Sequence, residues 1–464
     1  FVLDSINRIL NLQINHSDNS RYVPLKFFMN ENYDGSEFFD GKYRFNTVAD
    51  LNSMMALYDL LSKYFDKANA GSNGANAMID TDVTHQVHQT NSQMYDYYGE
   101  EEYSATYLMT DINLGSKLNV IAGFRNEINM TNYFSKSSLD HALAHWIFVH
   151  EKTQHRRDNS YSLPALFLNF KPTSWLNIKF ASTNTLTRPD YTSIIPLLRA
   201  NGGGRTVDWR NKFLEPGLSK NTDLSLSFHQ DKLGLFTIGY FQKKIDGLIY
   251  SSGQRVYFNA DNNSIDIPNM YKTYKILAYQ LNNPNKVDLK GWELDYQTRL
   301  WYLPNILSGL VLNANYTIAS SEVQYPRTVM EGYFDFDLMT FVQNNIDGTY
   351  EDKLIDQPNE IINVSIGYDY KGFSGRLSML YNDNVLMATD FWPELRQNTD
   401  AYKRWDLSLK QHLPIDGLEM FLNASNLTEA NDVSRYRGIT SAGENLKLEQ
   451  YYGKTIDLGL RYKF

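Results

Sequence analysis

The chain has 464 residues, a formal net charge of −9 and no cysteine. The mildly acidic balance argues against a nucleic-acid partner, because nucleic acid requires a basic surface. The absence of cysteine excludes disulfides, zinc–thiolate sites and cysteine nucleophiles. The mean hydropathy is −0.46, and no apolar run approaches the roughly 18 residues that a membrane-spanning helix needs.

Aromatic residues make up 14% of the chain, with 33 Tyr and 25 Phe. This content is typical of a transmembrane β-barrel, which carries aromatic girdles and exposes only alternate residues to lipid. Composition alone also fits a large soluble β-sandwich or a propeller. The sequence shows no signal peptide at Phe1, so we expect it to be a mature or truncated form.

Residues 1–102 are predicted to be an extracellular loop region with a helix at residues 48–66 and possible early barrel strands. An apolar stripe at helical spacing supports the helix: Leu51, Met55, Tyr58, Leu61 and Phe65. Thr47 followed by Asp50 resembles a capping box. Weak strand patterns lie at residues 23–28 and 42–47.

Residues 103–464 alternate between apolar and polar side chains, which indicates strands with two different faces. The last segment is the clearest: Ile456, Leu458, Leu460, Tyr462 and Phe464 alternate with polar residues. We predict about thirteen strands. They start near Tyr103, Leu118, Ser162, Leu176, Asn221, Leu235, Leu289, Leu307, Glu360, Ser374, Tyr402, Leu418 and Lys454.

The connections between these strands alternate in length. Short turns, such as residues 115–117 and 371–373, alternate with long polar stretches, such as residues 188–220 and 321–359. Outer-membrane barrels have short periplasmic turns and long extracellular loops. The predicted fold is therefore all-β, a transmembrane antiparallel up-and-down β-barrel in the outer membrane of a Gram-negative bacterium.

Several segments resemble the TonB-dependent receptor family. They are Thr187-Arg188-Pro189-Asp190-Tyr191, Phe213-Leu214-Glu215-Pro216, Gly291-Trp292-Glu293-Leu294-Asp295-Tyr296, Asn313-Ala314-Asn315-Tyr316-Thr317, Asn426-Leu427-Thr428 and the closing strand after Gly453. The second segment departs from the usual pattern of the family. Together the segments cover roughly residues 103–464, and their order and spacing carry the resemblance.

The resemblance implies a 22-stranded barrel with an N-terminal plug in its lumen. It also implies a segment that engages TonB, which works with ExbB and ExbD. Thirteen strands already occupy residues 103–464, and nine more would need roughly 250 residues, whereas 102 precede Tyr103. We therefore expect the plug, the TonB-binding segment and the early strands to be absent from this sequence.

Candidate ligand-binding residues are aromatic side chains in the predicted extracellular loops. They are Tyr250, Tyr257, Tyr271, Tyr274, Phe391 and Trp392. Such rings can stack on a sugar or an apolar ligand, but they can equally pack the loops against one another. His141 and His145 have a spacing that would suit a metal on a helix, yet they more simply read as polar loop residues. We predict no metal, no cofactor and no enzymatic activity, because no catalytic triad signature appears.

The predicted function is TonB-dependent uptake of a scarce, bulky nutrient: a siderophore, cobalamin, a glycan or a peptide. Expected partners are TonB, outer-membrane lipid and a surface-exposed substrate-binding lipoprotein. The alternatives are a passive pore of 14 to 18 strands and a structural or adhesive barrel. The sequence does not choose among the nutrients.

Overall fold

The computed structural model describes residues 28–33, 35–38, 43–45, 47–57, 59, 96–140, 148–201, 204–251, 255–256, 267–268, 271, 274, 275–277, 279–337, 339–390, 392–438 and 445–463. The chain divides into two compact units. One comprises residues 1–95 and 144–148, and the other comprises residues 96–143 and 149–464.

The described part of the first unit contains a small hairpin and a helical segment. Strand β1 (Ser36–Phe38) pairs antiparallel with β2 (Tyr43–Phe45). Residues 51–57 and 59 are helical. The Asp50 carboxylate accepts hydrogen bonds from the backbone N–H groups of Asn52 and Ser53, both at 3.3 Å.

Asp50 is therefore the N-cap of this helical segment. Thr47, which the sequence pattern placed at the start of a capping box, lies outside the helix. Residues 58 and 60–66 of the predicted helix, and residues 23–27 of a predicted strand, lie outside the described residues.

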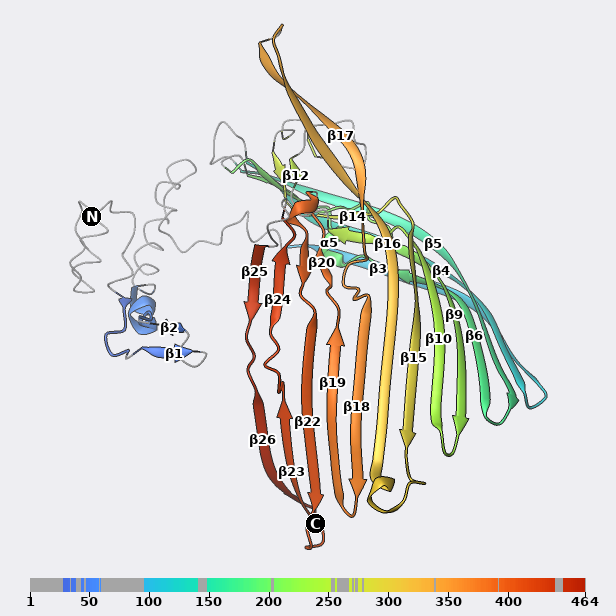
Figure 1. Cartoon of the computed structure of the whole chain (residues 1–464). Coiled ribbons are helices and arrows are strands. Elements are labelled where there is room, and N and C mark those ends of the chain that lie inside the picture. Colours follow the sequence, from blue (N-terminus) through green and yellow to red (C-terminus); the bar gives the residue numbers. More distant parts are fainter. Residues whose placement is uncertain are drawn as a thin grey trace. The chain divides into compact units, whose positions relative to one another are not determined.

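The second unit is built on thirteen long antiparallel strands (Figure 1). They are β3 (Tyr98–Leu114), β4 (Leu118–Asp140), β5 (Phe148–Thr173), β6 (Leu176–Thr187), β9 (Gly217–Gln230), β10 (Gly234–Asp246), β15 (Val287–Arg299), β16 (Leu310–Asp335), β18 (Glu360–Tyr370), β19 (Phe373–Asn382), β22 (Tyr402–His412), β23 (Leu418–Ser425) and β26 (Thr455–Tyr462). Each of the thirteen predicted strands corresponds to one of these. The all-β, antiparallel fold is confirmed.

One of the predicted strand starts falls in a different element. Leu307 does not begin a strand, because Asn305–Gly309 form a 3₁₀-helix and β16 starts at Leu310. Pro304 precedes this turn as its N-cap, and proline favours the first positions of a helix over a strand interior.

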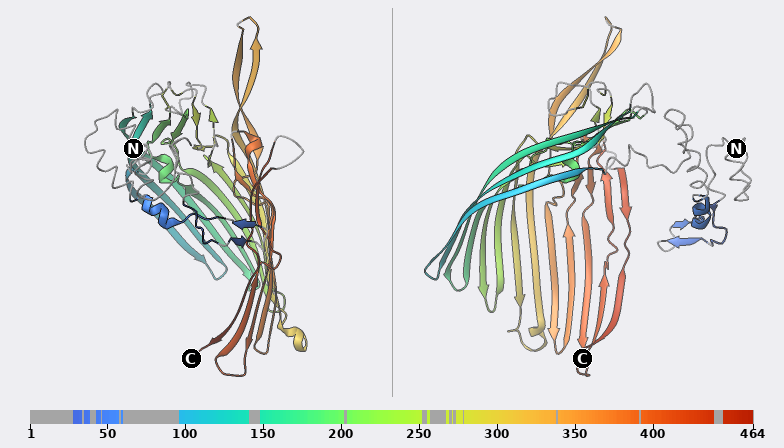
Figure 2. Two further views of the ribbon diagram at one scale, coloured as in Figure 1. Left: turned by 90° about the vertical axis from the view of Figure 1, so that its left-hand side faces the viewer. Right: turned by 180° about the vertical axis from the view of Figure 1, so that it is seen from behind.

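Consecutive long strands pair with each other along the sheet. The registers run from β5 through β6, β9, β10, β15, β16, β18, β19, β22 and β23 to β26, and a further register joins β3 to β4. The short turns gather at one end of the sheet (Figure 1). Figure 2 shows that the sheet curves strongly between its first and last strands.

The opposite end carries shorter elements. They are α5 (Tyr191–Ile194), β7 (Leu198–Asn201), β8 (Thr206–Trp209), β11 (Ile249–Ser251), β12 (Arg255–Val256), β13 (Lys275–Ile276), β14 (Gln280–Asn282), β20 (Leu386–Ala388), η6 (Pro393–Leu395), β21 (Gln397–Thr399), β24 (Asp432–Tyr436) and β25 (Asn445–Gln450). Strand β17 (Thr340–Asp352) pairs with the distal half of β16 as a long hairpin.

Much of the sequence that reads as polar loop is thus regular β-structure. Residues 321–359 contain the distal half of β16 and all of β17. Strands β4 and β5 extend in the same way into residues 135–161. No helix in the described part of the chain is long and apolar enough to cross a membrane.

Candidate functional site

The sheet has one apolar and one polar face, and the strand registers show which residues share each. On the last three strands, Leu458 lies opposite Leu422, which lies opposite Leu409. The neighbouring row places Asp457 opposite Asn423 and Asn423 opposite Ser408. Cross-strand partners point to the same side of a sheet, so the polar residues of these strands form one continuous surface.

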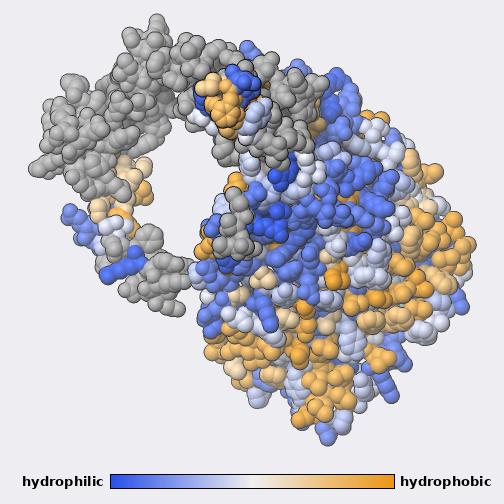
Figure 3. Space-filling view, turned by 45° about the horizontal axis from the view of Figure 1, so that its top comes forward, coloured by the Kyte–Doolittle hydropathy of each residue, from blue (hydrophilic) through white to orange (hydrophobic). Residues whose placement is uncertain are grey.

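Charged groups on the polar face find partners there. The Arg461 guanidinium lies 3.2 Å from the Glu419 carboxylate, and Arg376 lies 2.7 Å from Asp369. In the space-filling view, hydrophilic residues gather in one broad area of this unit, and hydrophobic residues lie in patches beside it (Figure 3). A sheet with this separation can face lipid on one side and water on the other.

The middle of the polar face holds two neighbouring hollows lined by carboxylates. Their volumes are about 420 and 350 Å³, and both are lined by Asp223 and Glu293. Asp295 lines the second hollow, where the side-chain amides of Asn315 and Gln297 donate hydrogen bonds to it. Three carboxylates on β9 and β15, the two strands that flank β10, make this region a candidate site for polar or cationic groups of a substrate.

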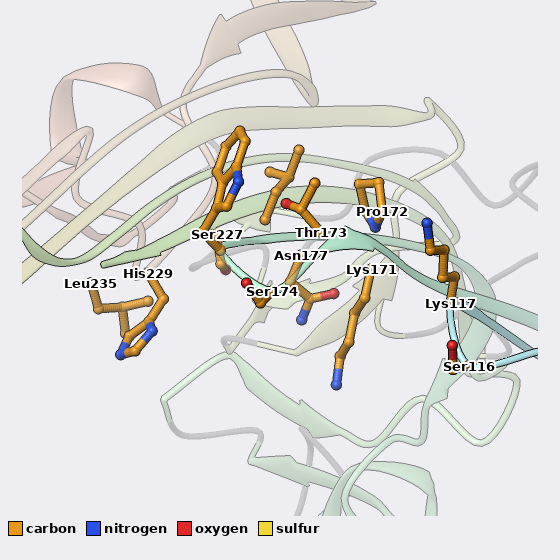
Figure 4. Close-up of a pocket in the computed structure, with 12 residues that line it drawn as sticks. Ser116, Lys117, Lys171, Pro172, Thr173, Ser174, Asn177, Ser227, His229 and Leu235 are labelled. Atoms are coloured by element: carbon orange, nitrogen blue, oxygen red, sulfur yellow. The ribbon is translucent and has the colours of Figure 1, made fainter. Parts of the chain in front are cut away.

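A basic hollow of about 710 Å³ lies at the short-turn end of the sheet (Figure 4). Lys117, Lys171 and His229 line it together with Ser116, Thr173 and Asn177, and none of its 12 lining residues is acidic. Ser227 pairs with Asn177 in the strand register, so this hollow opens on the polar face. The short-turn hollow thus carries lysines without a carboxylate, whereas the mid-sheet hollows combine carboxylates with Lys243.

A network of tyrosines and ion pairs lies on the polar face of β3 and β4, away from the short turn that joins these strands. The Glu101 carboxylate accepts hydrogen bonds from the hydroxyls of Tyr103 at 2.7 Å, Tyr191 at 3.3 Å and Tyr133. Burial and this hydrogen bond raise the pKa of the Tyr133 hydroxyl, and the charge of Glu101 raises the pKa of Tyr191. Both tyrosines therefore stay protonated as donors.

Arg188 connects this network to a second carboxylate, Glu127 on β4. Its guanidinium pairs with Glu127, which is buried, and lies 5.4 Å from the centre of the Tyr103 ring. Asp190 caps helix α5 through the N–H of Thr192 at 2.9 Å. The segment from Arg188 to Tyr191 is thus held to β3 and β4 through the side chains of Arg188 and Tyr191, while Asp190 caps the helix that follows.

The described aromatic residues predicted to bind ligand lie within the loop packing. Tyr271 and Tyr274 are 1% and 5% exposed, their rings are 5.1 Å apart, and both belong to a core that includes Trp209 and Tyr279. Tyr250 is 5% exposed and contacts Tyr325 at 5.4 Å between ring centres. These three rings stabilise the loops in this structure, and a ligand-binding role for them stays a prediction.

The remaining predicted site residues are less informative. Trp392 is partly buried beside η6. Tyr257, Phe391, His141 and His145 lie outside the described residues. Among the residues described, no group of three or more histidine, aspartate or glutamate side chains is placed to hold a metal ion.

A family model described as TonB dependent receptor-like, beta-barrel matches residues 3–427. The chain belongs to this family. TonB-dependent receptors are transporters of the Gram-negative outer membrane, not enzymes. A search of curated proteins finds no significant match.

Solved TonB-dependent receptors share the fold at low sequence identity. The ferric-catecholate import receptor Fiu from Escherichia coli K12 is 14% identical with a TM-score of 0.50, and 79% of this chain covers 45% of Fiu. The siderophore receptor PiuA from Acinetobacter baumannii is 14% identical with a TM-score of 0.50, over 80% of this chain and 44% of PiuA. The hemophore receptor HasR from Serratia marcescens, solved with its hemophore HasA and heme, is 14% identical with a TM-score of 0.51, over 79% and 52%. The chain thus spans about half the length of these receptors.

Sequence reasoning identified the polar rows of this receptor but not the groups that meet on them. Glu293 and Asp295 lie in the segment that carries the family resemblance, and their alternation with apolar residues placed them on the polar face. The contact of Glu101 with Tyr191 joins residues 90 positions apart, and no local pattern signals such a pairing. The residues that line the basic hollow likewise come from three segments that are far apart in the sequence.

Proposed function

We propose that this chain forms part of the wall of a TonB-dependent outer-membrane importer for a scarce, bulky nutrient. The observation that carries the proposal is the continuous polar face on a sheet whose other face is apolar. Within a barrel the apolar face contacts lipid and the polar face lines the lumen. Membership of the TonB-dependent receptor family supports uptake that is driven by TonB rather than passive diffusion through a pore.

Among nutrients, an iron chelate of the siderophore or heme kind is our first choice. The names of three structures that share the fold refer to a ferric catecholate, a siderophore and a hemophore with heme. Cobalamin, glycans and peptides are the other substrates to be tested. The carboxylates Asp223, Glu293 and Asp295 would contact polar groups of the substrate as it passes along the lumen.

The proposed partners follow from the same function. TonB, acting with ExbB and ExbD, would supply the energy. A surface-exposed lipoprotein that binds substrate would deliver it from outside. Outer-membrane lipid would surround the apolar face.

Growth of a deletion strain on a panel of sole nutrients, including ferric siderophores and heme as iron sources, tests the import. We expect slower growth on one nutrient, restored by the intact gene, and the same defect when TonB is removed. Uptake that persists without TonB would instead indicate a passive pore. A strain that grows like its parent on every nutrient but loses cell contact would indicate an adhesive barrel.

A further inference from the structure

The larger of the two mid-sheet hollows, about 420 Å³, gathers apolar side chains on the otherwise polar face of the sheet. Phe241, Leu289 and Ile361 line it from β10, β15 and β18. The segment 354–358, which connects β17 to β18, adds three more apolar residues: Leu354, Ile355 and Pro358. These side chains are not part of the apolar rows on the opposite face, so contact with lipid does not explain them.

The Phe241 ring lies between the two hollows and lines both of them. In the strand registers Phe241 stands opposite Asp223 on β9 and Gly291 on β15. The ring occupies the space that a side chain at Gly291 would need, because two of its carbons lie 2.6 and 2.9 Å from the position of a Cβ atom there. The glycine therefore lets the ring lean over β15, close to the backbone.

Two carboxylates without a partner stand beside this ring. Asp223 and Glu293 line both hollows with Phe241, and neither has a salt bridge or a side-chain hydrogen bond among the described residues. Asp356 lines the larger hollow and Asp295 lines the smaller one. Carboxylates thus dominate the charge around the ring.

Two other aromatic rings on the polar face show what such a combination holds. The Arg461 guanidinium lies 5.7 Å from the centre of the Phe421 ring and 3.2 Å from the Glu419 carboxylate. Arg188 lies 5.4 Å from the centre of the Tyr103 ring and also pairs with a carboxylate on β4. The face of an aromatic ring attracts a cation, and the carboxylate adds its charge. In both places the chain itself supplies the cation.

At Phe241 the ring and the carboxylates are present without such a cation. No lysine or arginine lies over this ring in the described part of the chain. Lys243 is the one cation that lines the two hollows, and it forms no salt bridge with Asp223 or Glu293. Lys179 lies in the same cross-strand row as Glu293 but is separated from it by β9 and β10.

A buried hydrogen-bond acceptor lies in the wall of the larger hollow. Gln357 is 8% exposed, and its side-chain oxygen has no hydrogen-bond partner among the described residues. Its amide nitrogen donates to the Asn359 side-chain oxygen at 3.2 Å, which leaves the Gln357 oxygen as the free atom. A buried acceptor without a partner is unfavourable, so this wall favours a ligand that donates an N–H group.

We propose that the two hollows around Phe241 form one binding site for an organic cation, an ammonium or guanidinium group carried on an apolar body. The cation would lie against the Phe241 ring and the carboxylates of Asp223 and Glu293. The apolar body would pack against Leu289 and Ile361 beneath the segment 354–358. This inference rests on the proposed function, because it names the class of substrate that the lumen wall would select.

Three probes that share a phenylethyl body test the required charge: phenethylammonium, phenethyl alcohol and hydrocinnamate. Each is titrated against the intact purified receptor in nanodiscs by ligand-observed NMR, and the signal from empty nanodiscs is subtracted. We expect phenethylammonium to bind at least about ten-fold more tightly than phenethyl alcohol. Hydrocinnamate should bind least, because the carboxylates repel it.

Three variants of the site separate the ring, the charge and the space. Phe241→Leu keeps an apolar side chain without the ring, so phenethylammonium should bind about three- to ten-fold more weakly. The double variant Asp223→Asn, Glu293→Gln should weaken it at least about ten-fold and leave phenethyl alcohol unchanged, which shows that the hollow is intact.

Gly239→Leu tests the space without altering the ring or a carboxylate. Gly239 lines the smaller hollow opposite Glu293, and a Cβ atom there would have its nearest neighbours 3.9 Å away. The new side chain therefore fits the strand and fills the hollow. Phenethylammonium should then bind at least about ten-fold more weakly.

Phe421→Leu and Asp457→Asn are the matched controls. Phe421 is on β23 and Asp457 is on β26, so both lie on the polar face but outside the two hollows. They remove the same kinds of group as the site variants. The affinity for phenethylammonium should equal that of the unmodified receptor in both.

Equal binding of the three probes, or tighter binding of hydrocinnamate, would overturn the cation site. A Phe241→Leu variant that binds phenethylammonium as tightly as Phe421→Leu does would also overturn it. Binding that appears only in a Lys243→Met variant would mean that Lys243 occupies the site, which is a third contrary result. The titrations need neither TonB nor uptake, so their failure leaves the importer standing. Uptake that persists without TonB would reject the importer and leave the cation site.

Discussion

The two halves of β16 differ in their side-chain pattern and in their neighbours, although they form one continuous strand. Its first half, from Leu310 to Glu322, lies between β15 and β18 and alternates apolar with polar residues. Its second half pairs with β17, is buried at its base through Val323 and Tyr325, and beyond that base exposes Tyr333 on one face and Phe334 on the other. Lipid against one face imposes the alternation in the first half, and water against both faces removes that constraint from the distal end of the second.

The contrast predicts its largest effect for a charge placed on the apolar face at mid-sheet. Ile366 is 53% exposed in the apolar row of β18, so Ile366→Arg would place a guanidinium in hydrocarbon. We expect the free energy of unfolding to fall by about 2–4 kcal/mol. Urea unfolding of the receptor in lipid vesicles, followed by tryptophan fluorescence, measures the change.

Ser365→Arg is the matched control, one residue away. Ser365 lies on the polar face, where its hydroxyl is 2.9 Å from that of Ser378. An arginine there can extend into water, so we expect a loss below about 1 kcal/mol. Equal losses for both variants would show that the two faces of β18 do not differ in environment.

A smaller loss of stability is expected for a side chain added at Gly291, where the neighbouring strands lie too close to the backbone to leave room for one. A Cβ atom at Gly291 would collide with the Ile318 carbonyl oxygen and lie 2.6 Å from the Phe241 ring. Gly291→Ala should therefore destabilise the receptor by about 1–3 kcal/mol. The same measurement applied to Gly123→Ala provides the comparison, because the nearest atom to a Cβ there is 3.5 Å away. If Gly291→Ala is as stable as Gly123→Ala, the close packing is not real.

The network at the upper end of β3 and β4 should contribute less, because water reaches part of it. Arg188→Ala leaves the buried Glu127 carboxylate with Arg125, 3.0 Å away, as its remaining cation, and we expect a loss of about 0.5–1.5 kcal/mol. Glu127→Gln should remove most of that penalty when combined with Arg188→Ala. A double-mutant cycle on the free energy of unfolding measures the coupling. Additive losses would mean that the two side chains do not interact.

The sequence was sufficient to predict strands wherever lipid enforces alternation. β22 and β26 are examples. Around Leu407 in β22 and Leu458 in β26, every second residue is apolar and polar residues or glycine stand between. The same pattern also located the polar face. It did not reveal the distal hairpin, because residues 321–352 carry polar and aromatic side chains on both faces and resemble a loop.

The candidate site was less predictable than the fold, for a different physical reason. The burial of Tyr271 depends on Trp209 and Tyr279, which come from separate loop segments. A loop tyrosine looks the same in sequence whether it faces a ligand or another loop. Glu101 likewise obtains its role from Tyr191 on a distant segment. Contacts of this kind follow from the closure of loops over the sheet, which local periodicity does not encode.

The smallest effect is expected in the distal hairpin of β16 and β17, and it completes the comparison with Ile366. Tyr333 is 54% exposed, nearly the same fraction as Ile366, but it lies near the distal end of β16, where both faces of the hairpin meet water. Tyr333→Arg should therefore change the free energy of unfolding by less than about 0.5 kcal/mol. Two side chains of equal exposure would then respond differently to the same charge, because exposure in this protein means lipid at one position and water at the other. A loss at Tyr333 as large as the loss at Ile366 would show that the hairpin also lies in an apolar environment, and the division of β16 into two halves would be wrong.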